Sequence, residues 1–171
     1  TSYIWTYSGT GETVNGTGRS VTIDYAAGAT SGYWTVAGTN GCATGTVSPN
    51  FDVTVFTPPT ATISPASPAT CSSTPIAITA TPAGGTPAYT THAWTGTGAA
   101  SLTSTSVTNP SFNNATGGSY GLTYTVTDSK GCTGSANTIV TVFQAPVANA
   151  GSDALGLCTG TSPIVLSGAT A

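Results

Sequence analysis

Apolar and polar residues alternate with a period of two in the clearest stretch of the chain, residues 119–143. This alternation is typical of a β-strand with one buried face and one solvent-exposed face. A turn-forming sequence, Asp-Ser-Lys-Gly, follows at 128–131, and a β-branched run returns at 138–143. The stretch therefore predicts a β-hairpin, and its alternating apolar residues are Tyr120, Leu122, Tyr124 and Val126.

Helix signals are missing, because 22 glycines and 11 prolines interrupt the sequence and no window shows three-four apolar spacing with caps. Strands are predicted at 60–63, 76–81, 91–95, 101–107, 111–113, 120–127 and 138–143. Short strands separated by turn residues favour an all-β, immunoglobulin-like sandwich. The core is expected to include Ile76, Trp94, Tyr120, Leu122, Tyr124, Val126 and Ile139, with Trp5 and Trp34 in equivalent places elsewhere.

The sequence contains an internal repeat of about 87 residues, which relates Trp5 and Trp34 to positions later in the chain. Phe56 and Phe143 lie 87 positions apart, and each ends a Val-Thr-Val-Phe run. Trp5 lies 89 positions before Trp94 in a similar strand sequence. Thr74-Pro75-Ile76 returns as Ser162-Pro163-Ile164. The sequence therefore predicts tandem immunoglobulin-like modules.

The repeat predicts three segments: 1–56 as the C-terminal part of one module, 57–143 as a complete module, and 144–171 as the first strands of a further module. Proline-containing joints of a few residues lie at 57–59 and 144–146. Because proline restricts its own φ and the preceding residue, such joints favour a stiff string of modules.

Charged residues make up only 4% of the chain, against about 25% in an ordinary soluble domain. With Arg19 and Lys130 as the only basic side chains, no basic patch exists to neutralise phosphates, so nucleic acid is excluded as a partner. No apolar run reaches 18 residues, so we expect neither membrane insertion nor an export signal within the sequence.

The four cysteines, Cys42, Cys71, Cys132 and Cys158, lie in polar, glycine-rich or serine-rich contexts. Together with the absence of methionine, they favour disulfides and an extracellular location, with buried free thiols as the alternative. Cys71 and Cys132 are expected at opposite ends of one sandwich, too far apart for a bond. We therefore expect crosslinks between modules, although a long loop at 64–73 leaves the internal pair open.

Residues 84–94 (GGTPAYTTHAW) and 117–132 (GGSYGLTYTVTDSKGC) resemble the PKD-like and related Ig-like repeats of large surface adhesins of gliding Bacteroidota. Residues 3–18, 37–42 and 148–160 are similar to sister versions of this repeat. The resemblance implies spacers, adhesive tips or accessory domains of secreted enzymes. One departure is that Thr-Gly-Thr-Gly follows Trp94 where PKD domains carry an acidic run, so no role of that run carries over.

The sequence shows no residue pattern that is typical of a catalytic site or of a strong metal site. His92 has no carboxylate near it in sequence, although Asp128 could approach it in space, and the five acidic residues are scattered. Neither a general base nor a paired-acid site is therefore predicted. No Cys or His spacing fits zinc, and Asp128 or Asp153 offers at most a share of a weak calcium site at a joint. We expect no enzyme activity and no cofactor.

The sequence is therefore interpreted as a non-enzymatic extracellular array, a stalk or filament of a secreted surface adhesin whose partners are neighbouring copies of the same repeat. The alternative is a carbohydrate-binding or accessory module of a secreted hydrolase, which would contact surface glycans through exposed aromatic residues. The candidates for such a platform are Tyr7, Tyr25 and Tyr89.

Placing residues 144–171 before residues 1–56 would complete a module of nearly 87 residues. We therefore expect Pro163–Leu166 to pair with the sheet that contains Trp5 of an adjacent copy, through chain continuity or as a donated strand. Such head-to-tail contacts do not close and generate a filament.

Overall fold

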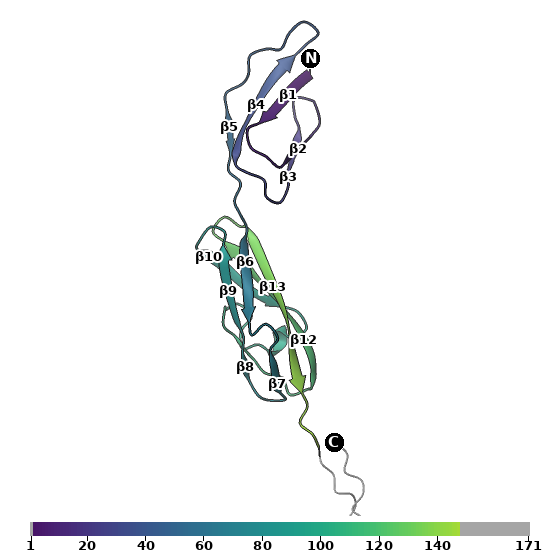
Figure 1. Ribbon diagram of the computed structural model, residues 1–171, viewed down its shortest axis with the longest axis vertical. Helices are drawn as coiled ribbons and strands as arrows, with labels where there is room; N and C mark the ends of the chain where they lie inside the picture. Colours follow the sequence, from purple (N-terminus) through teal and green to yellow (C-terminus); the bar gives the residue numbers. More distant parts are fainter. Residues whose placement is uncertain (1, 148–171) are drawn as a thin grey trace, which may run out of the picture. The chain divides into compact units, whose positions relative to one another are not determined.

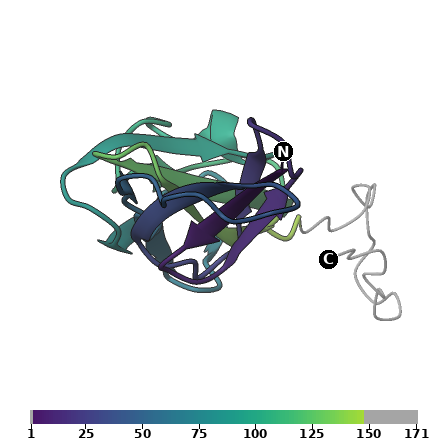
Figure 2. The same cartoon turned by 90° about the horizontal axis from the view of Figure 1, so that it is seen from above.

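The protein is all-β over residues 2–147, the part of the chain that the computed structural model describes (Figure 1). Thirteen strands and one 3₁₀ turn at Ala99–Ser101 account for its regular structure, and no α-helix occurs in this part. The predicted all-β fold class is confirmed, and each part of the described chain has its strands in more than one sheet, which fits a β-sandwich. Figure 2 gives the same strands in the perpendicular view.

Residues 2–56 form a three-stranded sheet and a two-stranded sheet. The larger sheet has the antiparallel order β1-β4-β5, in which Trp5 lies opposite Val36 and Trp34 lies opposite Phe51. The smaller sheet is the hairpin of β2 and β3, with Val14 opposite Ile23. The strands are β1 (Ser2–Tyr7), β2 (Glu12–Asn15), β3 (Thr22–Tyr25), β4 (Gly32–Thr39) and β5 (Phe51–Val53).

Residues 57–147 form one sheet of four strands, in the order β10-β12-β13-β7, and two sheets of two strands, β11-β8 and β6-β9. The two longest strands, β12 and β13, each have 11 residues and form the hairpin that the alternation predicted. The strands are β6 (Pro59–Ser64), β7 (Ala69–Cys71), β8 (Ile76–Ala77), β9 (Thr79–Gly84), β10 (Tyr89–Thr95), β11 (Ser111–Phe112), β12 (Gly118–Asp128) and β13 (Thr133–Phe143).

Burial follows the alternation on β12, where every second side chain from Leu122 to Asp128 is buried. Trp94 packs on Tyr124 with 5.0 Å between ring centroids, and its indole Nε1 donates a 2.8 Å hydrogen bond to the Val107 carbonyl. The core of this part of the chain is apolar, and its buried apolar residues are Ile78, Ala80, Trp94, Phe112, Leu122, Tyr124, Val126, Val140 and Val142.

Some expected core residues lie elsewhere. Ile139 is 61% exposed, because Val140 and Val142 take the inward positions of β13 and the pleat turns Ile139 outward. Ile76, Tyr120 and Trp5 are half-buried, whereas Trp34 is buried.

The prediction of a strand at residues 101–107 is wrong. The 3₁₀ turn ends at Ser101, Leu102 makes only an isolated bridge to Phe112, and the Ser104 hydroxyl accepts a 3.2 Å hydrogen bond from the Ser106 amide. Local bonds of this kind compete with strand ladders. Conversely, the sequence prediction missed β7, which pairs in parallel with the end of β13.

The predicted module boundaries at residues 57 and 143 stay a prediction. The last strand of the first part, β5, ends at Val53, and β6 begins at Pro59. The predicted third segment, 144–171, lies almost wholly outside the described residues, as do Cys158 and Pro163–Leu166.

Candidate functional site

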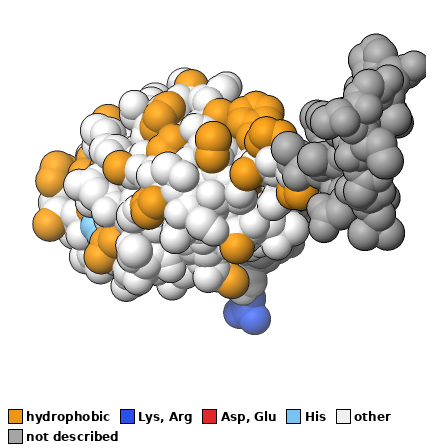
Figure 3. All heavy atoms as spheres, turned by 90° about the horizontal axis from the view of Figure 1, so that it is seen from below, with side chains coloured by type: hydrophobic (Ala, Val, Ile, Leu, Met, Phe, Trp, Pro, Cys, Tyr) orange, Lys and Arg blue, Asp and Glu red, His pale blue; other side chains and the backbone are white. Residues whose placement is uncertain are grey.

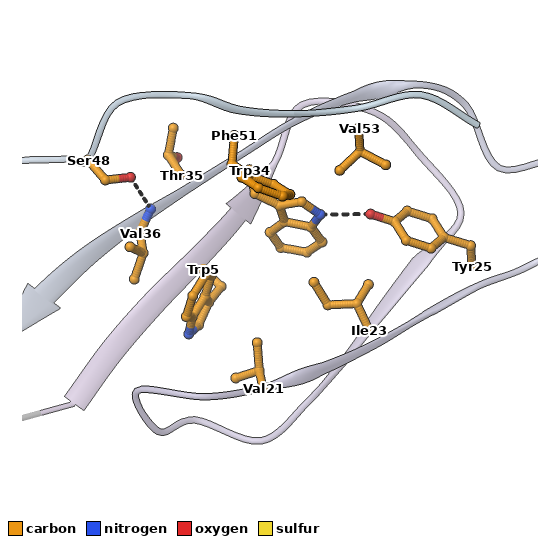
Figure 4. Close-up of a pocket in the computed structure, with 10 residues that line it drawn as sticks. All are labelled: Trp5, Val21, Ile23, Tyr25, Trp34, Thr35, Val36, Ser48, Phe51 and Val53. Atoms are coloured by element: carbon orange, nitrogen blue, oxygen red, sulfur yellow. Dashed lines mark hydrogen bonds between the residues drawn. The ribbon is translucent and has the colours of Figure 1, made fainter.

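A groove of about 520 Å³ opens between the sheet β1-β4-β5 and the hairpin of β2 and β3 (Figure 4). Its walls are almost entirely apolar and carry no charged side chain. From the sheet come Trp5, Trp34, Thr35, Val36, Phe51 and Val53, from the hairpin side come Val21, Ile23 and Tyr25, and Ser48 lies at the rim. A volume of this size lies within the range of ordinary ligand sites.

Hydrogen bonds and ring stacking hold the groove walls in place. The Trp34 indole Nε1 donates a 2.8 Å bond to the Tyr25 hydroxyl, and the Val36 amide donates a 3.0 Å bond to Ser48 Oγ (Figure 4). Behind Trp34, the Tyr7 ring stacks with 4.9 Å between centroids. The Tyr7 hydroxyl donates a 2.7 Å bond to the Thr30 carbonyl, and burial raises its pKa above the ordinary value for tyrosine. The aromatic wall is therefore preorganised.

The three tyrosines that the sequence suggested as a glycan platform differ in exposure and in the contacts they make. Tyr7 is 9% exposed and serves as packing behind the groove, whereas Tyr25 is 37% exposed and lines it. Tyr89 is half-buried, and its hydroxyl donates a 2.9 Å bond to the Gly84 carbonyl. Sequence analysis missed Val21, Ile23 and Phe51, although Phe51 lies two residues before the Val-Thr-Val-Phe run that ends at Phe56.

Asp128 is the buried charged side chain of the part of the chain that the structure describes, and its carboxylate organises a turn. Oδ1 accepts 2.9 Å bonds from the amides of Lys130 and Cys132, and Oδ2 accepts a 2.9 Å bond from the Thr86 amide. The Thr86 bond is the main cause that holds the pKa of Asp128 below its ordinary value. These bonds give Asp128, the last residue of β12, a structural role at the turn that leads to β13.

Of the remaining candidates for chemistry, His92 is half-buried on β10. Within residues 2–147 no group of three or more His, Cys, Asp or Glu side chains gathers as a metal site would require.

The cysteines of the described part are free thiols in this structure. Cys42 and Cys71 are exposed, and Cys132 is half-buried directly before β13. Cys158 lies outside the described residues, so the predicted pairing between modules stays a prediction.

The surface is poor in charge, as the composition requires. On the face shown in Figure 3, uncharged polar and backbone atoms surround small groups of hydrophobic side chains, and one basic side chain projects. In residues 2–147 no helix has the length and apolar character needed to cross a bilayer.

Comparisons with solved structures return immunoglobulin (Ig) domains and fibronectin(III)-like modules. Dscam1 isoform 8.4, N-terminal four Ig domains, aligns at 16% identity over 77% of this chain and 32% of that one, with a TM-score of 0.36. Dscam1 isoform 1.9 aligns at 18% identity over 84% of this chain and 37% of that one, with a TM-score of 0.36. The chain thus spans about a third of the length of these Dscam1 structures.

Fibronectin(III)-like modules of Clostridium thermocellum CbhA align at 10% identity over 90% of this chain and 83% of that one, with a TM-score of 0.41. No protein-family model and no curated protein matches the sequence.

Proposed function

We propose that the chain is a non-enzymatic, extracellular structural module that joins with copies of itself into a stalk or filament of a secreted surface adhesin. The observation that carries this proposal is the joint between the two parts of the chain, where five residues connect the end of β5 at Val53 to the start of β6 at Pro59. Pro58 and Pro59 restrict the backbone there, so the joint acts as a spacer of limited freedom.

Several further features support an extracellular structural role. The largest buried groups are packing residues, and the buried carboxylate of Asp128 is occupied by three backbone amides. Cysteines combined with an uncharged, threonine-rich and serine-rich surface suit an oxidising environment.

The stiffness of the joint is tested by the distance distribution between spin labels at Thr6 and Ile139, both exposed, in a chain whose native cysteines are serines. We expect one narrow distribution. A control chain with Gly-Ser-Gly-Ser inserted after Thr57 should give a broad one, because a flexible linker adds many conformations. If the native chain is as broad as the control, the spacer function is wrong.

A second candidate function, glycan binding, is favoured by the aromatic lining of the groove, since Trp5 and Tyr25 offer ring faces and edges to a sugar. Screening the chain on a glycan array, with Trp5→Ala as the comparison variant, tests it. Saturable binding that Trp5→Ala abolishes would support this function.

A further inference from the structure

In residues 57–147, the second part of the chain, a strand covers the position that corresponds to this groove. There β8 lies antiparallel to β11, with Ile76 opposite Phe112 and Ala77 opposite Ser111. The pairing continues beyond β8, because the Ile78 amide bonds the Pro110 carbonyl at 3.0 Å. As a result, Ile78 and Phe112 are completely buried.

The repeat places β3 of the first part where β11 lies in the second. Ile23 precedes Phe112 by 89 positions, the same offset that relates Trp5 to Trp94. Phe112 bridges to Leu102 on its other side, as Ile23 lies opposite Val14 of β2. However, β2 and β3 form a sheet of only two strands, so within residues 2–147 the other edge of β3 has no strand bonded to it.

The burial of equivalent residues shows the effect of this difference. Trp94, Val126 and Val140 are buried in the second part, whereas their counterparts Trp5, Val36 and Val53 are half-buried and line the groove. The counterpart of the buried Phe112 is the half-buried Ile23. The groove thus has the size and the apolar walls of a core from which one strand is missing.

We propose that this groove binds a β-strand formed by residues 162–168 of a second copy of the chain. The proposal rests on the structural role proposed above, because it names the partner through which copies join. Ser162-Pro163-Ile164 repeats Thr74-Pro75-Ile76, the residues that lead into β8. Residues 162–168 lie outside the described part of the chain.

The β8–β11 register fixes how this strand docks. Ile164 lies opposite Ile23 and Val165 opposite Thr22, as Ile76 and Ala77 lie opposite Phe112 and Ser111. Leu166 then takes the position of Ile78 and fills the groove between the sheets. Main-chain bonds to the free edge of β3 supply affinity, and the Leu166 side chain in its pocket supplies specificity.

A second copy is the source that the chain order favours. Pro59 lies beside Gly134 near the start of β13, whereas residues 162–168 follow Phe143 at its other end. A strand from the same chain would have to run back past about 30 Å of β13 before reaching the first part. A strand from a neighbouring copy can reach the groove without running back along β13.

Light scattering of the 171-residue chain across a concentration series tests the proposal. We expect oligomers whose mean mass rises with concentration. Leu166→Glu should weaken association at least about tenfold, because it places an unpaired charge in the apolar groove. The matched control is Val165→Glu, which should assemble normally, since its counterpart Ala77 faces solvent.

A disulfide trap tests the register directly, in chains whose four native cysteines are serines. Copies carrying Thr22→Cys are mixed with copies carrying Val165→Cys, and a crosslinked dimer is expected because opposed Cβ atoms lie about 5 Å apart. Copies carrying Leu166→Cys should not crosslink to Thr22→Cys, since adjacent strand residues point to opposite faces.

Several results would overturn the proposal: a chain that stays monomeric at all concentrations, oligomers insensitive to Leu166→Glu, no crosslinked dimer between the Thr22→Cys and Val165→Cys copies, or a groove that binds glycans and no strand. Strand docking fails independently of the spacer function. If the chain stays monomeric but the distance distribution between its spin labels is narrow, only the strand docking is wrong. If the chain assembles but that distance distribution is broad, only the stiff-spacer function is wrong.

Discussion

At the residue scale, Asp128 makes the folded state sensitive to acid. Its carboxylate accepts backbone bonds from Thr86, Lys130 and Cys132, and the first of these is the largest cause of its lowered pKa. Because the folded pKa lies below the unfolded value of 3.8, the stabilisation is complete well above that value. We expect the melting temperature to fall as pH drops through 3.8 and further through the folded pKa.

The control for this prediction is Asp128→Asn, which cannot titrate. It should melt lower than the native chain near neutral pH, because its amide nitrogen meets backbone donors, and it should lose less stability in acid. Melting curves by circular dichroism between neutral pH and pH of about 2 provide the measurement. Parallel acid profiles of the two chains would assign the acid sensitivity to other carboxylates.

The role of Asp128 in a turn was predictable from the Asp-Ser-Lys-Gly sequence, since aspartate commonly bonds backbone amides two residues on. Its bond to Thr86 was not, because that residue lies 42 positions away and reaches Asp128 only through the pairing of strands. Local chemistry is encoded nearby, but long-range partners depend on the whole sheet.

At the scale of elements, Trp94 on β10 and Ile139 on β13 represent the packing and the surface positions of the strands. Trp94→Ala should destabilise the chain by about 3–5 kcal/mol, because it leaves a cavity against Tyr124 and an unpaired Val107 carbonyl. The exposed Ile139→Ala should change stability by less than about 0.5 kcal/mol. Urea unfolding followed by tryptophan fluorescence and circular dichroism compares them, and equal midpoints for both variants would contradict this view of the core.

The sequence was informative where alternation was regular and failed where it was not. β12 and β13 follow from period two, although the sequence alone placed Ile139 on the wrong face of β13, because Thr138 to Phe143 are apolar or β-branched at every position. β7 is three residues long, too short to show a period. The groove escaped prediction because it depends on which edge of β3 is unpaired, a property of the sheet and not of any residue in it.

At the scale of the whole molecule, the positions of the cysteines favour bonds between copies. Cys71 lies opposite Phe143, the last residue of β13, whereas Cys132 directly precedes its first residue. Eleven residues of strand separate these levels by about 36 Å, and a disulfide needs Cα atoms within about 7 Å. We expect Cys71 of one copy to bond Cys42 of the next, and Cys158 to bond Cys132.

Mass spectrometry of unreduced peptides from oxidised, assembled chains identifies these pairs, with a reduced sample as the control. The Leu166→Glu chain should show them at much lower yield, since the bonds form only after copies join. A peptide pair of Cys71 with Cys132 from one chain would contradict the expectation.

If copies join by the strand docking proposed above, the free edge of β3 also gives their assembly a direction. Each copy would then offer one acceptor groove and one donor segment, so that a row of copies would end in an empty groove at one side and an unused strand at the other. The two ends therefore recruit new copies by different chemistry. A chain that lacks residues 162–168 enters the row by accepting a strand and offers none in return, so small amounts of it would set the length to which the filament grows.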